Sequence, residues 1–567
     1  MKTLTNRFAG LLTLLWTIVV LLLTLTPAQE MPRTPAWKFL SFDTAAHAGV
    51  FAVLAGLAWL WARPRWRYPA SLVLLGCLVF GALIEVLQYA MQLGRHAEWT
   101  DLLSDTIGAA LGVAIVGLAG RGRRQPALAL ALFLLPGQPR AQAVEPDLAR
   151  ARRTIEALAS PKMHGRGYVR QGEHRAAAYL RGRLRQLGLA PLAPNYTQPF
   201  TLDVNTFPGK LKLRLGYGFV PQLGRHWRLR PGWDFIAQPG SGSGRLSAGH
   251  NLYYLDSATA SNPTASQKFL AESRWPGTVV LLDSYVQHAE HLPSAVRSRV
   301  DSAVAVLRIV PKLTASLAPT QARQVQLEAL PHSMLHPFRP ATYSPAWAAA
   351  LRVDAQLLHN YPTQNLAAVV RGTTQPDSFL VVSAHYDHLG MMGRKTYFPG
   401  ANDNASGVAL LLELAAHYAR PENRPVCSIV FMLFGAEEAG LVGSGYFVQH
   451  PLVPLASIKF LLNLDLLGTG EEGATVVNGR VHEAAFARLT ALNDAHHYLP
   501  RLTARGRAAN SDHFPFSEAG VPAFFLYTRG GSLAYHDVND RPAALSLAGF
   551  AGAFGLARDF LDALGAR

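Results

Sequence analysis

Long apolar stretches alternate with short basic segments over the first 120 residues. The apolar stretches cover residues 8–25, 45–62, 70–91 and 102–119. Each is close to the ~20 residues that a membrane-spanning helix needs. Eight Lys or Arg residues flank one side of these stretches and three flank the other, so the positive-inside rule places the N-terminus in the cytoplasm. The pattern predicts a four-span helical membrane domain over residues 1–120. The alternative is four buried helices of a soluble protein.

A fifth, shorter apolar run follows this region. Basic residues at 121–124 precede apolar residues at 127–136 and the small-residue string at 141–143. This layout is typical of a signal peptide. Residues 121–143 are therefore predicted to be a signal-like or anchor segment. Such a segment would send the rest of the chain outside the cytoplasmic membrane, to the periplasm or cell exterior. If the run only lies at the interface, the rest would be cytoplasmic.

The pattern changes to that of a soluble protein from residue 144. Apolar residues at helical spacing over 149–188, clearest at 176–187, predict an amphipathic helix. In the last third, apolar runs predict alternating strands and helices. The strands are 379–384, 427–434, 458–464 and 523–527, and the helices are 404–419, 438–449, 480–493 and 545–564. This alternation predicts an α/β sandwich with a mostly parallel central sheet, which binds ligands at the carboxyl ends of its strands.

The predicted soluble part contains an irregular insertion. Residues 205–345 are rich in Pro, Gly and Ser, with short β-like pieces at 210–215 and 277–282. We therefore predict a β-rich insertion over 205–345. It interrupts a domain whose first part is 144–204 and whose second, motif-bearing part is 346–567.

Composition and charge narrow the possible functions. Charged residues make up 16% of the chain and apolar residues 49%, which excludes a disordered polyelectrolyte. The net charge of +16 divides into +5 over residues 1–125, +14 over 126–380 and −3 over 381–567. This spread argues against a nucleic-acid partner, which requires a concentrated basic face. The basic segment at 126–380 favours binding to an acidic surface, or it is simply a solvated face.

The cysteine count restricts the kind of metal site. The chain has two cysteines, Cys77 in an apolar run and Cys427 far away in the soluble part. Two cysteines so far apart in the sequence exclude a thiolate zinc finger, and a disulfide between them is unexpected. His, Asp and Glu must therefore hold any metal ion.

Polar side chains follow the predicted strands of the last third, at the point where each strand ends. Acidic and imidazole groups gather there: His385 and Asp387, Asp403, Glu437 and Glu438, Asp465, and His536 with Asp537. The carboxyl ends of parallel strands meet at one edge of a sheet, so we expect these groups to converge. Any one of them alone could be a helix cap or a surface charge.

Two His with several carboxylates and no Cys suit a catalytic Zn²⁺ site. Two ions close together need a bridging carboxylate and terminal ligands on each side. The pair Glu437-Glu438 can supply one ligand and one general base. Asp387, two residues after His385, is well placed to accept the other N–H of that imidazole.

These strings together resemble the di-zinc exopeptidases of metallopeptidase family twenty-eight, of the bacterial leucyl aminopeptidase and aminopeptidase Y type. The resemblance runs from about residue 150 to 565 and implies an α/β fold, with a protease-associated-type domain inserted in many relatives. It implies that Asp403 bridges two zinc ions, that His385 and Asp465 complete one site, and that Glu438 and His536 complete the other. Glu437 would be the general base, and the Asp403–Asn404 peptide bond would be cis.

A further matching string, Ser511-Asp512-His513, is expected to support the site rather than to bind metal. The chain departs from some relatives three residues before that Ser. They carry a Tyr proposed to steady the oxyanion, whereas this chain has Ala508. The oxyanion donor is therefore not identified from the sequence.

The first 120 residues resemble the VanZ-like membrane family. The polar residues that carry this resemblance are also functional candidates, because ionisable groups in a membrane are costly. Those candidates are Asp43, His47, Glu85, Gln88, Arg95, Asp101 and Asp105. Wetted headgroup positions are the alternative. The family implies a link to glycopeptide resistance in a few members, but no firm reaction.

The preferred hypothesis is a membrane-tethered, extracytoplasmic di-zinc aminopeptidase. It would act on peptide substrates and contact membrane lipid, with no nucleic acid and no cofactor beyond two Zn²⁺. The alternatives are a glutaminyl-cyclase-like acyltransferase on the same fold, a zinc-free receptor-like ectodomain, and a VanZ-type cell-envelope resistance factor with an accessory peptidase. The complete set of candidate ligands favours the first.

Overall fold

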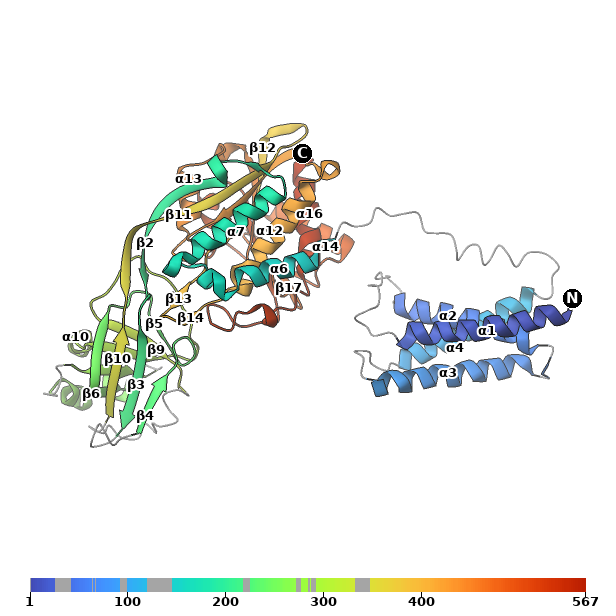
Figure 1. Cartoon of the computed structure of the whole chain (residues 1–567), viewed down its shortest axis with the longest axis horizontal. Helices are drawn as coiled ribbons and strands as arrows, with labels where there is room; N and C mark the ends of the chain where they lie inside the picture. The colour runs from blue at the N-terminus through green and yellow to red at the C-terminus, as the bar shows by residue number, and fades with distance from the viewer. Residues whose placement is uncertain are drawn as a thin grey trace. The chain divides into compact units, whose positions relative to one another are not determined.

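The computed structural model describes residues 2–25, 42–63, 65–66, 68–91, 99–119, 145–217, 225–271, 277–283, 286, 292–331 and 347–566. The chain forms two compact units, Met1–Ala141 and Gln142–Arg567 (Figure 1). The predicted signal-like segment, residues 121–143, lies outside the described residues.

The described residues of the first unit form four long helices, one for each predicted apolar stretch. They are α1 (Lys2–Leu25), α2 (Phe42–Ala62), α3 (Pro69–Met91) and α4 (Trp99–Ala119). Helices α2 and α4 pack closely because α4 presents glycine where the backbones meet. A Cβ on Gly108 would lie 2.0 Å from the carbonyl oxygen of Ala48, and one on Gly112 would lie 2.0 Å from that of Ala52. Small residues four apart allow this close helix approach.

No helix in the described part of the chain is both long and apolar enough to cross a membrane. The prediction of four spans is therefore not confirmed, although each predicted stretch does form a helix. Among the seven polar candidates of this unit, Asp105 has a described side chain. It is buried in α4, where its carboxylate lies against Gly81 of α3. The remaining six side chains lie outside the described ones: Asp43, His47, Glu85, Gln88, Arg95 and Asp101.

The second unit is built on a mixed sheet. Its strands are β1 (Ala190–Pro191), β2 (Thr197–Thr206), β11 (Gln356–Val370), β12 (Gln375–His385), β15 (Cys427–Phe434), β16 (Ile458–Leu464), β17 (Gly473–Val477), β18 (Leu502–Ala504) and β19 (Ala523–Arg529). They are ordered β1-β11-β15-β12-β16-β19-β17-β18, with β2 also paired to β11. The four central strands, β15, β12, β16 and β19, are parallel. Strands β11 and β17 join them antiparallel on either side, so the mostly parallel sheet of the prediction is confined to the centre.

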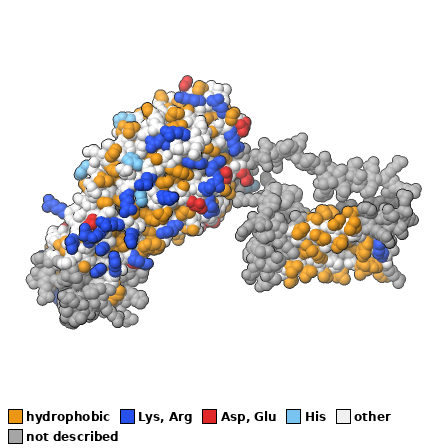
Figure 2. All heavy atoms as spheres, in the orientation of Figure 1, with side chains coloured by type: hydrophobic (Ala, Val, Ile, Leu, Met, Phe, Trp, Pro, Cys, Tyr) orange, Lys and Arg blue, Asp and Glu red, His pale blue; other side chains and the backbone are white. Residues whose placement is uncertain are grey.

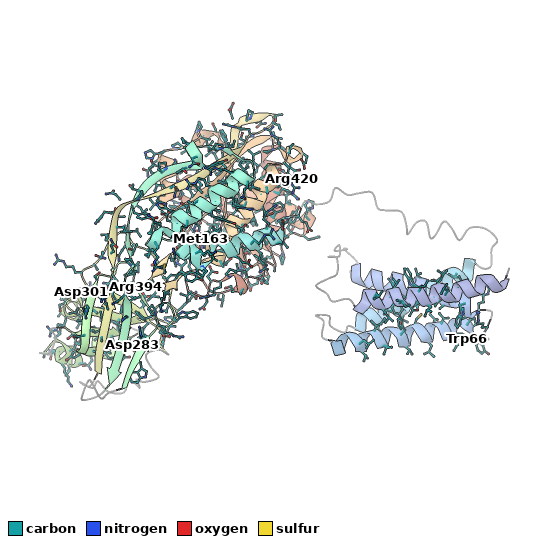
Figure 3. The ribbon with its side chains drawn as sticks, viewed as in Figure 1. Trp66, Met163, Asp283, Asp301, Arg394 and Arg420 are labelled. Carbon is teal, nitrogen blue, oxygen red and sulfur yellow. The ribbon has the colours of Figure 1, made fainter. Side chains whose placement is uncertain are left out.

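Helices cover this sheet and complete the core (Figures 1 and 3). They are α6 (Leu148–Leu158), α7 (Gly172–Gln186), α12 (Gly407–Tyr418), α13 (Val442–Gln449), α14 (Glu483–His496), α15 (His513–Glu518) and α16 (Phe550–Gly565). Short helical turns lie at Pro161–Arg166, Val169–Gln171, Pro194–Tyr196, Ala401–Ser406, Pro421–Asn423, Leu455–Ser457 and Pro542–Ala544. Met163, between α6 and α7, packs against the main core. The single helix predicted over 149–188 is therefore two helices, and Pro161 begins the turn after the first.

The predicted β-rich insertion, residues 205–345, forms most of a second sheet, and one strand of that sheet lies just beyond the predicted boundary. Its strands are β3 (Leu211–Tyr217), β4 (Arg225–Leu229), β5 (Phe235–Ala237), β6 (Gly244–Leu255), β7 (Val279–Leu282), β8 (Ala305–Ile309), β9 (Val325–Ala329) and β10 (Trp347–Val353). They are ordered β4-β3-β10-β6-β7-β8-β9-β5. Short helices α8 (Ser257–Ser261), α9 (Pro263–Leu270) and α10 (Ser294–Asp301) accompany it, and β13 (Met391–Met392) pairs with β14 (Thr396–Tyr397) nearby in the chain. The apolar core of this subdomain also includes Leu389, Met392, Phe398 and Val538 of the motif-bearing part.

Candidate metal centre

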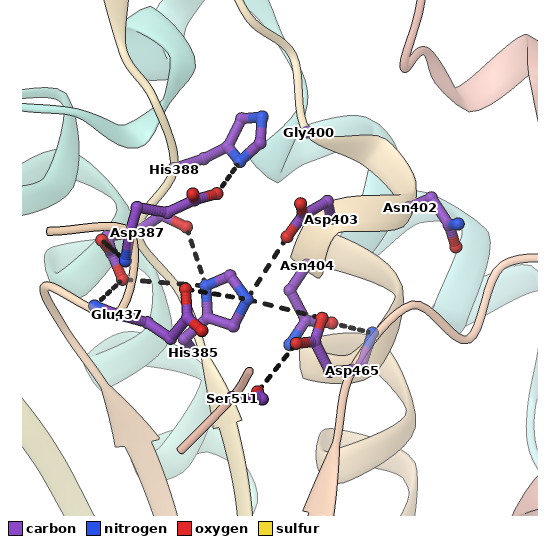
Figure 4. A network of polar contacts seen from close by, with 12 residues as sticks. His385, Asp387, His388, Gly400, Asn402, Asp403, Asn404, Glu437, Asp465 and Ser511 are labelled. Carbon is purple, nitrogen blue, oxygen red and sulfur yellow. Dashed lines mark hydrogen bonds and ion pairs between the residues drawn. The ribbon is translucent and has the colours of Figure 1, made fainter. Parts of the chain in front are cut away.

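The predicted site residues converge at the carboxyl edge of the central strands (Figure 4). Strand register explains why: His385 ends β12 opposite Phe434, the last residue of β15, so the acidic pair at 437–438 begins three residues beyond it. Asp465 directly follows β16. Asp403 lies in the turn before α12, and its peptide bond to Asn404 is cis, as the resemblance implied.

The two carboxylate oxygens of Asp403 face two different groups. Oδ1 lies 3.3 Å from Nε2 of His385, which is also 3.4 Å from Oδ1 of Asp465. Oδ2 lies 3.1 Å from Nε2 of His536, which is also 3.1 Å from Oε2 of Glu438. Asp403 therefore lies between two sets of donor atoms, each with one imidazole and one further carboxylate.

This donor arrangement fits two zinc ions. Tetrahedral zinc with bonds of about 2.0 Å sets its ligand atoms ~3.3 Å apart, which matches the separations within each set. His385 can share a metal ion with Asp403 and Glu438, or with Glu437 and Asp465. Oδ1 of Asp465 is buried and makes no hydrogen bond, so a cation would satisfy it. The chemistry, all nitrogen and oxygen with no sulfur, is that of a catalytic zinc site.

The adjacent carboxyl groups of Glu437 and Glu438 have opposite pKa shifts. Burial, reinforced by the charges of Glu438 and Asp512, raises the pKa of Glu437 well above its ordinary value. Burial also opposes ionisation of Glu438, but His536 and His388 hold the pKa of that carboxyl at about 2. Two neighbouring carboxyl groups with divergent pKa values are typical of a division between a proton-transferring group and a permanently charged one.

Asp387 contacts both the acidic pair and the His385 imidazole. Its carboxylate accepts the backbone N–H groups of Glu437 at 3.1 Å and Glu438 at 3.4 Å, and so fixes the acidic pair. Its backbone carbonyl, 3.3 Å from Nδ1 of His385, is the group within hydrogen-bonding reach of that imidazole. The carboxylate oxygen is farther from the same nitrogen, at 3.7 Å.

The string at 511–513 lies beside Asp465, one of the candidate ligands. Ser511 donates a hydrogen bond to Oδ2 of Asp465 at 2.9 Å and accepts one from Asn463. Asp512 is fully buried, and burial raises its pKa to about 7. Burial lowers the pKa of His513 to about 4. Ser511 therefore orients a candidate ligand, while Asp512 and His513 lie in the core behind it.

Sequence reasoning missed two buried residues that contact the candidate ligands. His388 lies three residues after His385, and its Nδ1 is 2.6 Å from Oε1 of Glu438. Asp540 accepts the backbone N–H groups of Asn402 and Asp403, at 2.8 Å and 3.0 Å. His388 lies in the string that begins at His385, and Asp540 lies four residues after His536. Their closeness in sequence to His385 and His536 was the available signal.

A third missed residue, Arg166, comes from the turn between α6 and α7. Its guanidinium is completely buried and donates to five backbone carbonyls. The acceptors are those of Tyr386, Leu158, Pro399, Gly400 and Asp403, at 2.7 to 3.2 Å. Two of them, Pro399 and Gly400, begin the turn that carries Asp403. Arg166 therefore fixes the backbone on both sides of the candidate metal centre, and the sequence carried no local signal for it.

The insertion also reaches the site. The backbone carbonyl of Ala315 lies 2.8 Å from Nδ1 of His536, and the Ala315 N–H donates to the carbonyl of His536 at 3.0 Å. Lys312 adds a hydrogen bond to the carbonyl of Leu533. A backbone carbonyl on the second nitrogen of a metal-binding imidazole fixes its tautomer and orientation. The insertion is thus part of the site's support.

Tyr535 places a phenol beside the same carboxylates. Its ring stacks on His536 with centroids 3.9 Å apart and an interplanar angle of 17°. Burial raises the pKa of Tyr535, and the charges of Asp403 and Glu438 raise it further. The phenol therefore keeps its proton, and with 47% of the residue exposed it is accessible to a substrate.

Two family models match the chain. Residues 365–560 match Peptidase family M28, and residues 6–120 match VanZ/LLP1. The chain carries an M28 region behind a VanZ/LLP1 region. Arg166 and Ala315, which support the candidate ligands, both lie outside the M28 region.

Curated relatives are similar over the M28 region. A probable zinc metalloprotease of Pyricularia oryzae is 41% identical over 113 residues, which is 19% of this chain and 22% of that protein. Aminopeptidase YwaD of Bacillus subtilis is 33% identical over 171 residues, 29% of this chain and 35% of that protein. The chain thus spans well under half the length of these two relatives.

Solved structures share the fold of the second unit. A zinc aminopeptidase from Bacillus subtilis aligns with a TM-score of 0.52 at 19% identity, covering 73% of this chain and 93% of that one. A peptidase M28 precursor from Shewanella amazonensis aligns with a TM-score of 0.53 at 15% identity, covering 74% and 93%. The M28 region and the insertion together therefore have the α/β architecture of these proteins.

Proposed function

We propose that the chain is a zinc-dependent aminopeptidase that removes N-terminal residues from peptides. The observation that carries the proposal is Asp403, whose two oxygens lie within 3.3 Å of two different imidazoles. Asp403 would bridge two zinc ions, His385 and Asp465 would complete one site, and Glu438 and His536 the other. The names of the relatives, which include an aminopeptidase and a zinc metalloprotease, support the same activity.

When bound, the zinc ions would supply Lewis-acid polarisation of the scissile carbonyl and acidify a water molecule. The remaining steps belong to side chains. Glu437 would accept the proton of the attacking water at Oε2, which lies 4.0 Å from Nε2 of His385. It would then return that proton to the leaving amine nitrogen. Its raised pKa suits this exchange, because a general base works best when its pKa approaches the working pH.

The protonated phenol of Tyr535 would donate a hydrogen bond to the oxyanion. We expect Tyr535→Phe to lower kcat by about 100-fold, since one lost oxyanion donor costs roughly that much, with KM and zinc content almost unchanged. Tyr527→Phe is a matched control, because that phenol lies on β19 and accepts a hydrogen bond from Arg505, which is not a proposed ligand. Equal kcat values for Tyr535→Phe and the wild type would remove Tyr535 from the mechanism.

Zinc content tests the ligand assignment. The full chain should bind two zinc ions, and His536→Ala should retain about one, because the donor set of His385, Asp403 and Asp465 stays intact. Elemental analysis of the purified variants measures this directly. His496→Ala, with a half-exposed imidazole on α14, is the control and should keep both ions. Two zinc ions in His536→Ala would contradict the assignment of that ligand.

We further propose that the first unit attaches the chain to the cytoplasmic membrane and that the peptidase unit lies on its outer side. The first unit exposes large apolar side chains, including Leu14 and Leu22 of α1 and Val79 and Val86 of α3, each at least 60% exposed (Figure 2). An apolar patch on this scale favours a lipid or protein partner over water. The basic and signal-like segment at 121–143 supports the outer location.

A reporter enzyme that is active only outside the cytoplasm, fused after Arg567, should be active. An inactive fusion would contradict this location.

A further inference from the structure

One face of the inserted sheet is apolar and the other is basic. Along β3 the buried Leu211, Leu213 and Leu215 alternate with Lys212 and Arg214. The same alternation places the partly or fully exposed side chains of Arg228 on β4, Arg245 on β6 and Arg352 on β10 on the outer face. The basic face is defined here as Lys212, Arg214, Arg228, Arg245 and Arg352.

Strand register brings these cations together in pairs. Arg214 lies directly opposite Arg228, and Arg352 lies between Lys212 on one neighbour and Arg245 on the other. Like charges directly opposite each other on a sheet are destabilising. Asp354 forms an ion pair with Arg352 at 2.8 Å and offsets one of the five positive charges. The face therefore remains cationic. Figure 2 shows Lys and Arg gathered at this end of the unit.

A fold that only needed a solvated surface would not require five cations in register. The sheet does not need this arrangement for its core, since the apolar faces of the same strands supply that core.

The cations spread in two dimensions. Neighbouring strands are about 4.8 Å apart, so four strands carry charge over roughly 15 Å across the strand direction. An extended acidic peptide would follow one strand and would meet only one or two of these cations. A surface with anionic groups side by side can meet all five.

We propose that the basic face docks on the anionic phospholipid headgroups of the membrane to which the first unit attaches. The inference rests on the proposed attachment, which holds the second unit at high local concentration near a bilayer. Each Lys or Arg near such a surface strengthens binding by about fivefold, so the face would hold this subdomain against the membrane in a salt-sensitive way.

The test uses the full chain reconstituted into phosphatidylcholine vesicles with or without phosphatidylglycerol. Lys212 is the reporter, and its acetylation by a membrane-impermeant reagent is compared with that of the exposed Lys162 by mass spectrometry. We expect Lys212 to be protected about tenfold relative to Lys162 in the anionic vesicles only, with the protection lost at high salt. Equal labelling in both kinds of vesicle would overturn the proposal.

A charge-matched pair of variants separates this face from overall charge. Arg214→Gln, Arg228→Gln and Arg245→Gln combined should weaken docking by about 100-fold and abolish the protection. Arg152→Gln, Arg153→Gln and Arg175→Gln combined remove the same charge from exposed positions on α6 and α7 and should preserve it. The first variant should melt no lower than the wild type, because it removes a like-charge cross-strand pair. Loss of protection in both variants would show that net charge alone is responsible, and would overturn the proposal.

Two further outcomes are distinguishable. If a soluble polyglutamate peptide protects Lys212 on phosphatidylcholine vesicles as strongly as the anionic lipid does, the partner is an acidic polymer and the lipid proposal is wrong. If alkaline washing removes the full chain from both kinds of vesicle while Lys212 protection at neutral pH persists, the attachment by the first unit fails and the docking of the basic face stands.

Discussion

Glu437→Gln is expected to reduce kcat by about 1,000-fold while two zinc ions stay bound. The reason is that the amide cannot accept the proton of the attacking water, and general-base catalysis contributes about 100- to 10,000-fold. Glutamine keeps the shape of the side chain, and the backbone N–H of residue 437 can still donate to Asp387. The measurement is kcat on a dipeptide or peptide amide, together with elemental analysis of the same preparation.

The variant Glu438→Gln distinguishes the roles of the two adjacent carboxyl groups. Its carboxylate lies 3.1 Å from His536 and 2.6 Å from His388, so this variant should lose zinc as well as activity. A Glu437→Gln enzyme that retained peptide hydrolysis would remove Glu437 as the base. Loss of zinc from Glu437→Gln would instead make this residue a ligand, which its distance of 4.0 Å from Nε2 of His385 permits.

Arg166→Met should destabilise the second unit by about 3–5 kcal/mol and weaken zinc binding by about 10- to 100-fold. The substitution leaves five buried carbonyl groups without their donor, and it removes a fixed positive charge that interacts with Asp403 and Asp540. Thermal unfolding and competition with a zinc indicator measure the two effects. Arg166→Lys should recover little of the lost stability or zinc affinity, because an ammonium group cannot reproduce the rigid planar set of donors.

Arg150→Met is the matched control for this result. Arg150 also binds a buried group, with Nε and one Nη of its guanidinium 2.7 Å and 2.6 Å from the carboxylate oxygens of Glu413 on α12. We expect it to lose stability but not zinc affinity. If both variants lose zinc affinity in proportion to their stability, Arg166 has only a structural role. If Arg166→Met keeps zinc affinity outright, its link to the metal centre is wrong.

The candidate site was largely predictable because its residues follow apolar runs. The predicted strands at 427–434 and 458–464 coincide with β15 and β16, and polar groups begin where these strands end. Parallel register then brings those ends together whatever the intervening loops do. The outer strands were harder to predict: β17 is short, follows a turn-rich segment, and pairs antiparallel with β19.

The supporting contacts were not predictable from local pattern. Arg166 lies more than 200 residues before Asp403, and Ala315 lies more than 200 residues before His536. Arg166 donates from its side chain to distant backbone carbonyls, and Ala315 acts through its own backbone groups. Every residue type offers backbone groups equally, so no motif marks either contact. The basic face was partly predictable, because the alternation of Leu with Lys and Arg at 211–215 indicates a strand with one apolar and one basic face. Only the register of β3, β4, β6 and β10 reveals that the cations face one another.

The most direct test of the central claim is the cleavage of matched peptides by the purified, zinc-loaded full chain. One set of peptides has a free N-terminus, and the same set is N-acetylated. We predict release of the first residue from the free peptides only, its loss after zinc is chelated, and its recovery when zinc is restored. Cyclisation of N-terminal glutamine without hydrolysis, or no release from any free peptide by protein carrying two zinc ions, would contradict the proposal.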